Sequence, residues 1–132
     1  MGTLTTDFIF DMEKILVVDD EVDICYFLVR NLKKQDFEAS YVNSISEAKT
    51  EMKSNEPSIL LLDNHLPDGF GIDFAHEIKE LYPALKIVMI TAHDTQADRS
   101  RAAKNGIDYF LPKPFMINQV FDAIDIVKKQ AS

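Results

Sequence analysis

Short apolar runs that stop abruptly at polar residues constrain the fold of this chain more than any other feature. Three runs of four apolar residues occupy positions 15–18, 59–62 and 87–90, and a shorter run occupies 110–111. Apolar runs of this length between turn formers are typical of strands that are buried on both faces of a parallel sheet. The sequence therefore predicts an α/β protein built on such a sheet.

Polar side chains follow these runs at the carboxyl end of each predicted strand. They are the carboxylates of Asp19, Asp20 and Asp63, the hydroxyl of Thr91 and the ammonium group of Lys113. In an open α/β sheet, the loops that leave the carboxyl ends of the strands form the ligand-binding crevice. We therefore expect these five groups to meet in one crevice.

Predicted strands and helices alternate five times along the chain. The strands are expected at 14–19, 38–42, 58–63, 86–91 and 108–111, and the helices at 21–35, 45–54, 70–80, 95–104 and 115–129. This alternation indicates a single domain over residues 13–130, with right-handed crossovers and helices on both faces of the sheet. Residues 1–12 precede the first strand, and we interpret them as a mobile leader or a remnant of a tag.

Charge and composition exclude several classes of function. The net charge of -8 argues against direct binding of nucleic acid, which requires a surplus of Lys and Arg. No apolar run approaches the ~20 residues that span a bilayer, and the first residues lack the basic start of a signal peptide. The single cysteine, Cys25, cannot form an internal disulfide, which fits a reducing compartment. We expect a cytoplasmic protein that contacts no membrane.

The order of these elements resembles the receiver domain of two-component response regulators, from Glu13 to about Lys129. The matching elements are Asp19-Asp20, Asp63 with Pro67 and Gly71 in the following loop, Thr91-Ala92 and Lys113-Pro114. The resemblance implies a flavodoxin-like, doubly wound (βα)5 fold with a five-stranded parallel sheet of order 2-1-3-4-5. It also implies a cis peptide bond between Lys113 and Pro114.

Three carboxylates in one crevice repel one another unless a cation compensates them, and oxygen-only ligands favour a hard cation such as Mg²⁺. By resemblance, Asp20 and Asp63 bind the ion directly, Asp19 assists through water and the backbone carbonyl of His65 completes the set. Mn²⁺ is expected to substitute. An alternative for Asp19-Asp20 is a strand end that caps the following helix, where negative charge is favoured.

The resemblance assigns phosphoryl chemistry to three of the strand ends. Asp63 is expected to be the phosphoacceptor, Lys113 to offset negative charge, and Thr91 to donate its hydroxyl to a phosphoryl oxygen. The aromatic switch residue, three positions before the lysine, is Phe110, which lacks the hydroxyl of a tyrosine. The alternatives are a turn-opening Asp63, a solvated Lys113 and a Thr91 that only finishes its strand.

Two histidines stand at the second positions after Asp63 and Thr91. His65 and His93 are interpreted either as exposed loop residues or as residues that tune dephosphorylation or its pH dependence. The third histidine, His76, is expected on the solvent face of a helix.

Together with this resemblance, the sequence predicts a phosphorylation-dependent signalling switch and not an enzyme in the usual sense. Such a domain promotes its own phosphotransfer and dephosphorylation. The alternatives are a receiver-like interaction module that is never phosphorylated and a Mg²⁺-dependent phosphohydrolase. The phosphohydrolase pattern has two aspartates separated by one residue, which Asp19-Asp20-Glu21 lacks.

The expected partner is a sensor histidine kinase or a phosphotransfer protein. The helix at 21–35 carries more large apolar residues than one core stripe buries: Ile24, Leu28 and Leu32 are assigned to its inner face, and Phe27 points partly outward. We expect Ile24 and Phe27, together with Pro114 and Phe115, to dock the phosphohistidine domain; alternatively, Phe27 only shields the last helix. The helix at 95–104, the strand at 108–111 and the helix at 115–129 form a candidate homodimer face.

Overall fold

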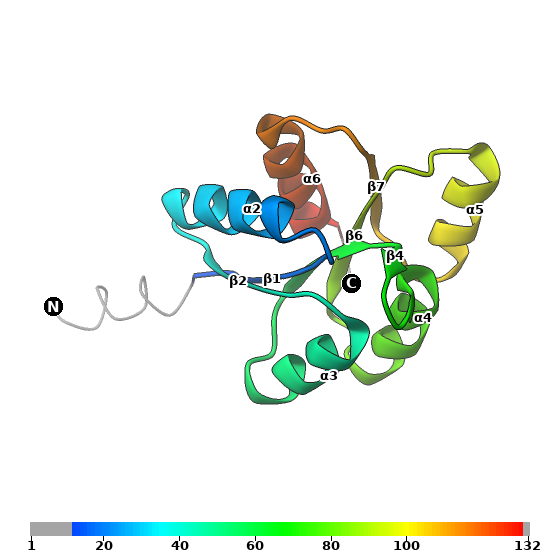
Figure 1. The fold of residues 1–132 in the computed structure, drawn as a ribbon, viewed down its shortest axis with the longest axis horizontal. Helices are drawn as coiled ribbons and strands as arrows, with labels where there is room; N and C mark the ends of the chain where they lie inside the picture. Colours follow the sequence, from blue (N-terminus) through cyan, green and yellow to red (C-terminus); the bar gives the residue numbers. More distant parts are fainter. Residues whose placement is uncertain (1–11, 131–132) are drawn as a thin grey trace, which may run out of the picture.

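Five parallel strands form one central sheet in the computed structural model, which describes residues 12–130 (Figure 1). The strand order is β2-β1-β3-β6-β7, which is 2-1-3-4-5 when only these five strands are counted. The predicted fold class is therefore confirmed. The predicted leader, apart from Met12, lies outside the described residues.

The element bounds agree with the predicted ones to within two residues. The strands are β1 (Lys14–Val18), β2 (Glu38–Val42), β3 (Ile59–Asp63), β4 (His65–Leu66), β5 (Gly69–Phe70), β6 (Lys86–Thr91) and β7 (Tyr109–Pro112); the helices are α2 (Val22–Lys34), α3 (Ile45–Ser54), α4 (Gly71–Leu81), α5 (Gln96–Lys104) and α6 (Ile117–Lys129).

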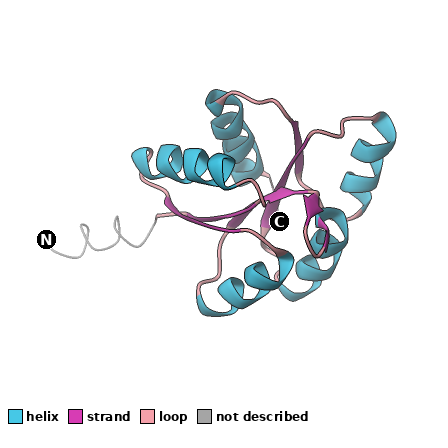
Figure 2. Ribbon diagram, viewed as in Figure 1, coloured by secondary structure: helices cyan, strands magenta, loops and turns pink. Residues whose placement is uncertain are grey.

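Helices cover both faces of the sheet, as Figures 1 and 2 show, because alternate residues of each central strand point to opposite faces. Ile15 and Val17 of β1 belong to the core cluster beneath α2 and α6. Leu16 and Val18 belong to the cluster beneath α3, α4 and α5. None of the helices between residues 12 and 130 is long and apolar enough to cross a membrane.

The inner face of α2 differs from the predicted one. Cys25, Leu28 and Leu32 are fully buried, whereas Ile24 is only partly buried. Ile24 still packs against the core cluster beneath this helix, and Cys25 takes a fully buried position, since an unpaired cysteine is among the most buried residue types. Glu21 was expected in the first turn of the helix, but it is the N-cap residue.

The loop after β3 holds a small hairpin that the sequence analysis did not predict. Strands β4 and β5 pair through His65 with Phe70 and through Leu66 with Gly69. Asp68, at the tip, accepts hydrogen bonds from the backbone N–H groups of Ile45 and Ser46, which lowers the pKa of its carboxyl. The hairpin is thereby attached to the start of α3.

A close backbone approach requires glycine at position 71. The Gly71 N–H donates to the Asn64 carbonyl at 2.7 Å, and a Cβ on Gly71 would lie 2.3 Å from the backbone oxygen of Asp63. Real Cβ atoms do not approach so closely, so this glycine lets α4 start directly beneath the end of β3. The Lys113-Pro114 peptide is cis, as predicted.

Candidate functional site

The predicted site residues gather at the carboxyl edge of the sheet. β1, β3 and β6 are neighbours, so the residues at their ends are brought close together. A pocket of about 340 Å³ opens at this edge, and its walls are formed by Asp20, Glu21, Asp63, His65, Thr91, Ala92, His93 and Lys113. Asp19 does not line this pocket, but it lies 3.2 Å from Lys113, which does.

Two of the three predicted carboxylates are buried. Asp19 is 2% exposed and Asp63 is 6% exposed, whereas Asp20 faces solvent. One oxygen of Asp19 accepts from the backbone N–H of Glu21 at 2.9 Å, which closes a short turn before α2. Asp19 is not the helix cap, because the N-cap residue is Glu21 and no side chain caps this helix.

The ammonium group of Lys113 lies among three carboxylates. Its Nζ is 2.8 Å from Glu21, 3.2 Å from Asp19 and 3.7 Å from Asp63. The Lys113 side chain is only 13% exposed, and its backbone N–H donates to the Thr91 carbonyl at 2.8 Å. The sequence analysis missed Glu21 as a partner of Lys113; its place beside Asp19-Asp20 was the available signal.

Burial leaves this pocket with more negative charge than it can stabilise. Burial and the neighbouring Asp19 raise the pKa of Asp63 from 3.8 to about 6, and burial also raises the pKa of Asp19. Burial opposes the charged form of Lys113, but its carboxylate partners outweigh burial and raise its pKa. The site therefore favours an additional cation.

The oxygen donors fit a hard divalent ion. Carboxylate oxygens of Asp19, Asp20 and Glu21 lie within 4.8 Å of one another, and Asp63 borders the same pocket. Oxygen-only ligands around a water-accessible pocket suit Mg²⁺, which keeps several waters and takes one or two carboxylates. Glu21, which was not among the predicted ligands, is engaged by Lys113 here.

Thr91 and Phe110 lie on the adjoining strands β6 and β7. Thr91 is buried, and its hydroxyl accepts from the His93 backbone N–H at 3.3 Å. Phe110 is partly buried, and the guanidinium of Arg99 lies 4.9 Å above its ring. Arg99, which pairs with Asp94, is a neighbour of Phe110 that the sequence analysis did not identify.

The four predicted docking residues lie together. Ile24, Phe27, Pro114 and Phe115 line a largely apolar hollow of about 480 Å³, together with Glu21, Asp23, Ala92 and Lys113. Phe27 is 47% exposed. This hollow shares Glu21, Ala92 and Lys113 with the acidic pocket, so the two are continuous.

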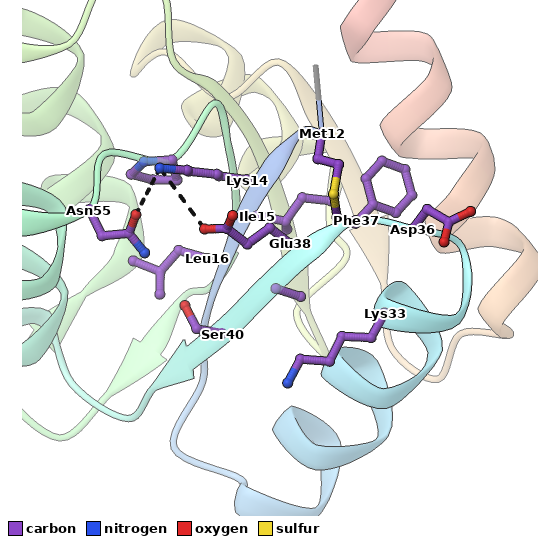
Figure 3. Close-up of a pocket in the computed structure, with 12 residues that line it drawn as sticks. Met12, Lys14, Ile15, Leu16, Lys33, Asp36, Phe37, Glu38, Ser40 and Asn55 are labelled. Atoms are coloured by element: carbon purple, nitrogen blue, oxygen red, sulfur yellow. Dashed lines mark hydrogen bonds and ion pairs between the residues drawn. The ribbon is translucent and has the colours of Figure 1, made fainter. Parts of the chain in front are cut away.

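A larger cavity, of about 510 Å³, lies at the amino ends of β1 and β2, away from the strand ends that carry the site (Figure 3). In this cavity the ammonium group of Lys14 donates a hydrogen bond to the side-chain oxygen of Asn55 and lies 3.9 Å from the carboxylate of Glu38. The cavity holds none of the predicted site residues.

Comparison with known proteins identifies the family. The model of the response regulator receiver domain matches residues 15–125. The chain belongs to this family. The receiver fold thus accounts for nearly all of the described residues.

Solved receiver structures agree with this assignment. A non-phosphorylated HemR receiver domain from Leptospira biflexa is 28% identical, with a TM-score of 0.83, over 91% of this chain and 97% of that one. A response regulator from Clostridium difficile is 23% identical, with a TM-score of 0.85, over 90% and 98%. One from Burkholderia pseudomallei, solved with a phosphorylated aspartic acid and a calcium ion, is 23% identical, with a TM-score of 0.79, over 84% and 65%.

Proposed function

We propose that this receiver domain is a signalling switch in which Asp63 accepts a phosphoryl group from a histidine kinase or a phosphotransfer protein. The observation that carries the proposal is the burial of Asp63 beside Asp19, Asp20 and Lys113, where the negative charge of Asp63 is unfavourable without a cation. The phosphorylated aspartic acid of the Burkholderia pseudomallei regulator gives a precedent in a protein of the same fold.

In the proposed transfer, an oxygen of Asp63 forms a bond to phosphorus while the phosphorus–nitrogen bond of phosphohistidine breaks, and the released imidazole keeps the electron pair. Lys113 offsets the negative charge of the Asp63 carboxylate and of the incoming phosphoryl group. Thr91 donates its hydroxyl to a phosphoryl oxygen. Mg²⁺, held by Asp20, Asp63 and the His65 carbonyl, with Asp19 acting through water, would supply further charge compensation.

Acetyl phosphate tests the chemistry without a partner protein. With Mg²⁺, or Mn²⁺ in its place, the wild type should gain one acid-labile and base-labile phosphoryl group, and Asp63→Asn should gain none. Asp73→Asn, which alters an exposed aspartate in the first turn of α4, should label like the wild type. Mass spectrometry that finds full labelling of Asp63→Asn would contradict the proposal and favour another acceptor. No labelling of the wild type would favour an interaction module.

Phosphorylation is proposed to act through Thr91 and Phe110. As Thr91 moves toward the phosphoryl group, Phe110 turns inward into the space that Thr91 leaves, and the outer face of α5 and β7 changes. That face, together with α6, is the proposed homodimer surface. Amide exchange over residues 91–115 should differ with and without beryllofluoride, and equal exchange would place the output on another face.

The apolar hollow beside the pocket is proposed to dock the phosphohistidine domain. Its continuity with the acidic pocket would bring a donor seated on Phe27 and Phe115 close to Asp63. Phe27→Ala should slow phosphorylation by a cognate kinase far more than by acetyl phosphate. Tyr26→Ala removes an exposed aromatic side chain that does not line the hollow, and it should change neither rate. An equal loss with both donors in Phe27→Ala would mean that Phe27 supports the fold.

A further inference from the structure

Two histidine rings lie against each other at the wall of the acidic pocket. The ring centroids of His65 and His93 are 4.2 Å apart, and their planes are inclined by 34°. Both residues line the pocket that contains Asp63, and both are exposed. The sheet order explains the encounter, because β3 and β6 are adjacent and pair Asp63 with Ile90. The loops that follow these strands therefore start side by side.

The His65 ring is packed on two sides, and the His93 residue is fixed through its backbone. His65 lies in β4, where it pairs with Phe70, and its ring also packs edge-on against the Phe70 ring at 5.5 Å. The backbone of His93 is attached to the Thr91 hydroxyl. Ligands that are already held in place lose less conformational entropy on binding than free side chains do.

We propose that His65 and His93 together bind a borderline divalent ion of the Zn²⁺, Ni²⁺ or Cu²⁺ class at the entrance of the acidic pocket. Imidazole nitrogens suit these ions, whereas carboxylate oxygens suit Mg²⁺. With metal–nitrogen bonds of about 2.0–2.1 Å, a tetrahedral ion holds two donor nitrogens roughly 3.3 Å apart. The ring contact brings the two imidazoles within reach of one ion, and both side chains must turn about their own torsions so that one nitrogen of each ring faces it.

The electrostatic surroundings favour a cation at this point. The carboxylates of Asp20 and Asp63 border the same pocket as the two rings. The described residues therefore offer two neighbouring sites of different ligand type. One has oxygen donors in the pocket, and the other has nitrogen donors at its entrance.

Binding is tested by titrating Zn²⁺ into the protein with Mg²⁺ in saturating excess, so that the oxygen site is already occupied. Calorimetry should give one Zn²⁺ per chain, and the ring signals of His65 and His93 should shift together in NMR spectra. His65→Gln and His93→Gln should each weaken binding by at least about tenfold, because losing even an outer-shell partner of a metal ligand costs about 10- to 100-fold.

His76→Gln is the matched control, because His76 is the chain's third histidine and lies exposed on α4 beside Glu80. Its affinity for Zn²⁺ should equal that of the wild type. Loss of binding in His76→Gln alone would move the site to His76 and Glu80. Loss of Zn²⁺ binding in Asp20→Asn, with normal binding in His65→Gln and His93→Gln, would place Zn²⁺ in the oxygen site. Either result, or an absence of binding, overturns the inference.

The position at the entrance has its own test. Zn²⁺ should slow phosphorylation of the wild type and of His76→Gln by acetyl phosphate in excess Mg²⁺, and it should leave the rate of His93→Gln unaltered. Wild-type rates that are equal with and without bound Zn²⁺ would overturn the placement at the entrance. The calorimetric measurement involves no phosphoryl transfer, so its outcome is separate from that of the proposed function.

Discussion

The two ends of β1 carry the same kinds of charged group in opposite environments. At the amino end, Lys14 and Glu38 lie 3.9 Å apart with their side chains about half exposed. At the carboxyl end, Lys113 lies 3.2 Å from Asp19 and 3.7 Å from Asp63, in a pocket where all three side chains are largely buried. Exposed ion pairs contribute about 0–1 kcal/mol, because water stabilises the separated charges nearly as well.

Burial changes the balance at the carboxyl end, because one lysine serves more than one buried carboxylate there. The pKa of Asp63 is raised to about 6 by burial and by Asp19, although Lys113 acts in the opposite direction. The charged groups at the amino edge are thus stabilised by water, whereas the buried negative charge at the carboxyl edge is unfavourable until a cation or a proton binds there. This difference predicts matched pairs of variants with unequal effects.

The largest expected effect is on the rate of phosphoryl transfer. Lys113→Ala should slow labelling by acetyl phosphate by about a hundredfold or more, because a charged donor is removed from a site where charge develops. Lys14→Ala should label at the wild-type rate. Rates should be measured by mass spectrometry at saturating Mg²⁺. A similar loss in both variants would mean that lysine at the carboxyl edge has only a structural role.

The next effect concerns stability and pH in the absence of metal. Because the pKa of Asp63 is higher when folded than its ordinary 3.8, the folded state binds the proton more tightly. This contribution to stability is present below about pH 4 and is lost as the pH rises through about 6. A pKa that rises from 3.8 to about 6 corresponds to at most about 3 kcal/mol.

Asp63→Asn should therefore stabilise the metal-free protein at pH 7 and flatten its dependence on pH. Glu38→Gln, at the amino edge, should change neither the stability nor its dependence on pH by much. Urea unfolding at several pH values between 4 and 8 measures the stability of both variants. If Asp63→Asn is less stable than the wild type at pH 7, the Asp63 carboxylate is better compensated than its surroundings indicate.

Backbone crowding also differs between the two edges. Gly71→Ala should destabilise the protein by about 1–3 kcal/mol, because the added Cβ meets the backbone oxygen of Asp63 and the turn must shift. Asp36, in the turn before β2, has a φ of 65° without being glycine. Asp36→Gly should have a free energy of unfolding within about 0.5 kcal/mol of the wild type, because the relief of backbone strain offsets the greater entropy of the unfolded chain. Urea unfolding that ranks the two variants in reverse order would contradict this.

The smallest effect is expected from two cations that lie over aromatic rings. Arg99 lies over Phe110 near the carboxyl edge, and Lys128 lies 5.8 Å from the Phe37 ring near the amino edge. Arg99→Ala should let Phe110 turn inward more often before phosphorylation, which would tighten beryllofluoride binding slightly. Lys128→Ala should leave this binding unchanged. NMR titration with beryllofluoride measures both, and tighter binding in Lys128→Ala alone would reverse the assignment.

The strand ends were the most predictable part of this protein. Apolar runs located the strands β1, β3, β6 and β7, and their polar neighbours identified Asp19, Asp63, Thr91 and Lys113 as residues that the structure brings to one edge. A strand buried on both faces has a strong local signal. The family resemblance supplied the strand order, which hydrophobic periodicity does not contain.

The missed features depend on contacts between distant segments. Asp68 reaches the start of α3, Glu21 reaches Lys113, and Arg99 reaches Phe110. A polar residue on the surface has the same local sequence pattern whether its side chain meets water or a partner. The β4–β5 hairpin was missed because two-residue strands carry no periodicity.

Patterns within a few residues located the helices and the strands of the central sheet, and placed particular chemical groups at the strand ends, because burial and turn formation leave local signals. How those groups share their charges follows from the packing of the folded chain. The adjacency of β3 and β6 brings His65 to His93, and the burial of the strand ends raises the pKa of Asp63. Both depend on distances across the sheet and on exclusion of water, which only the packed chain defines.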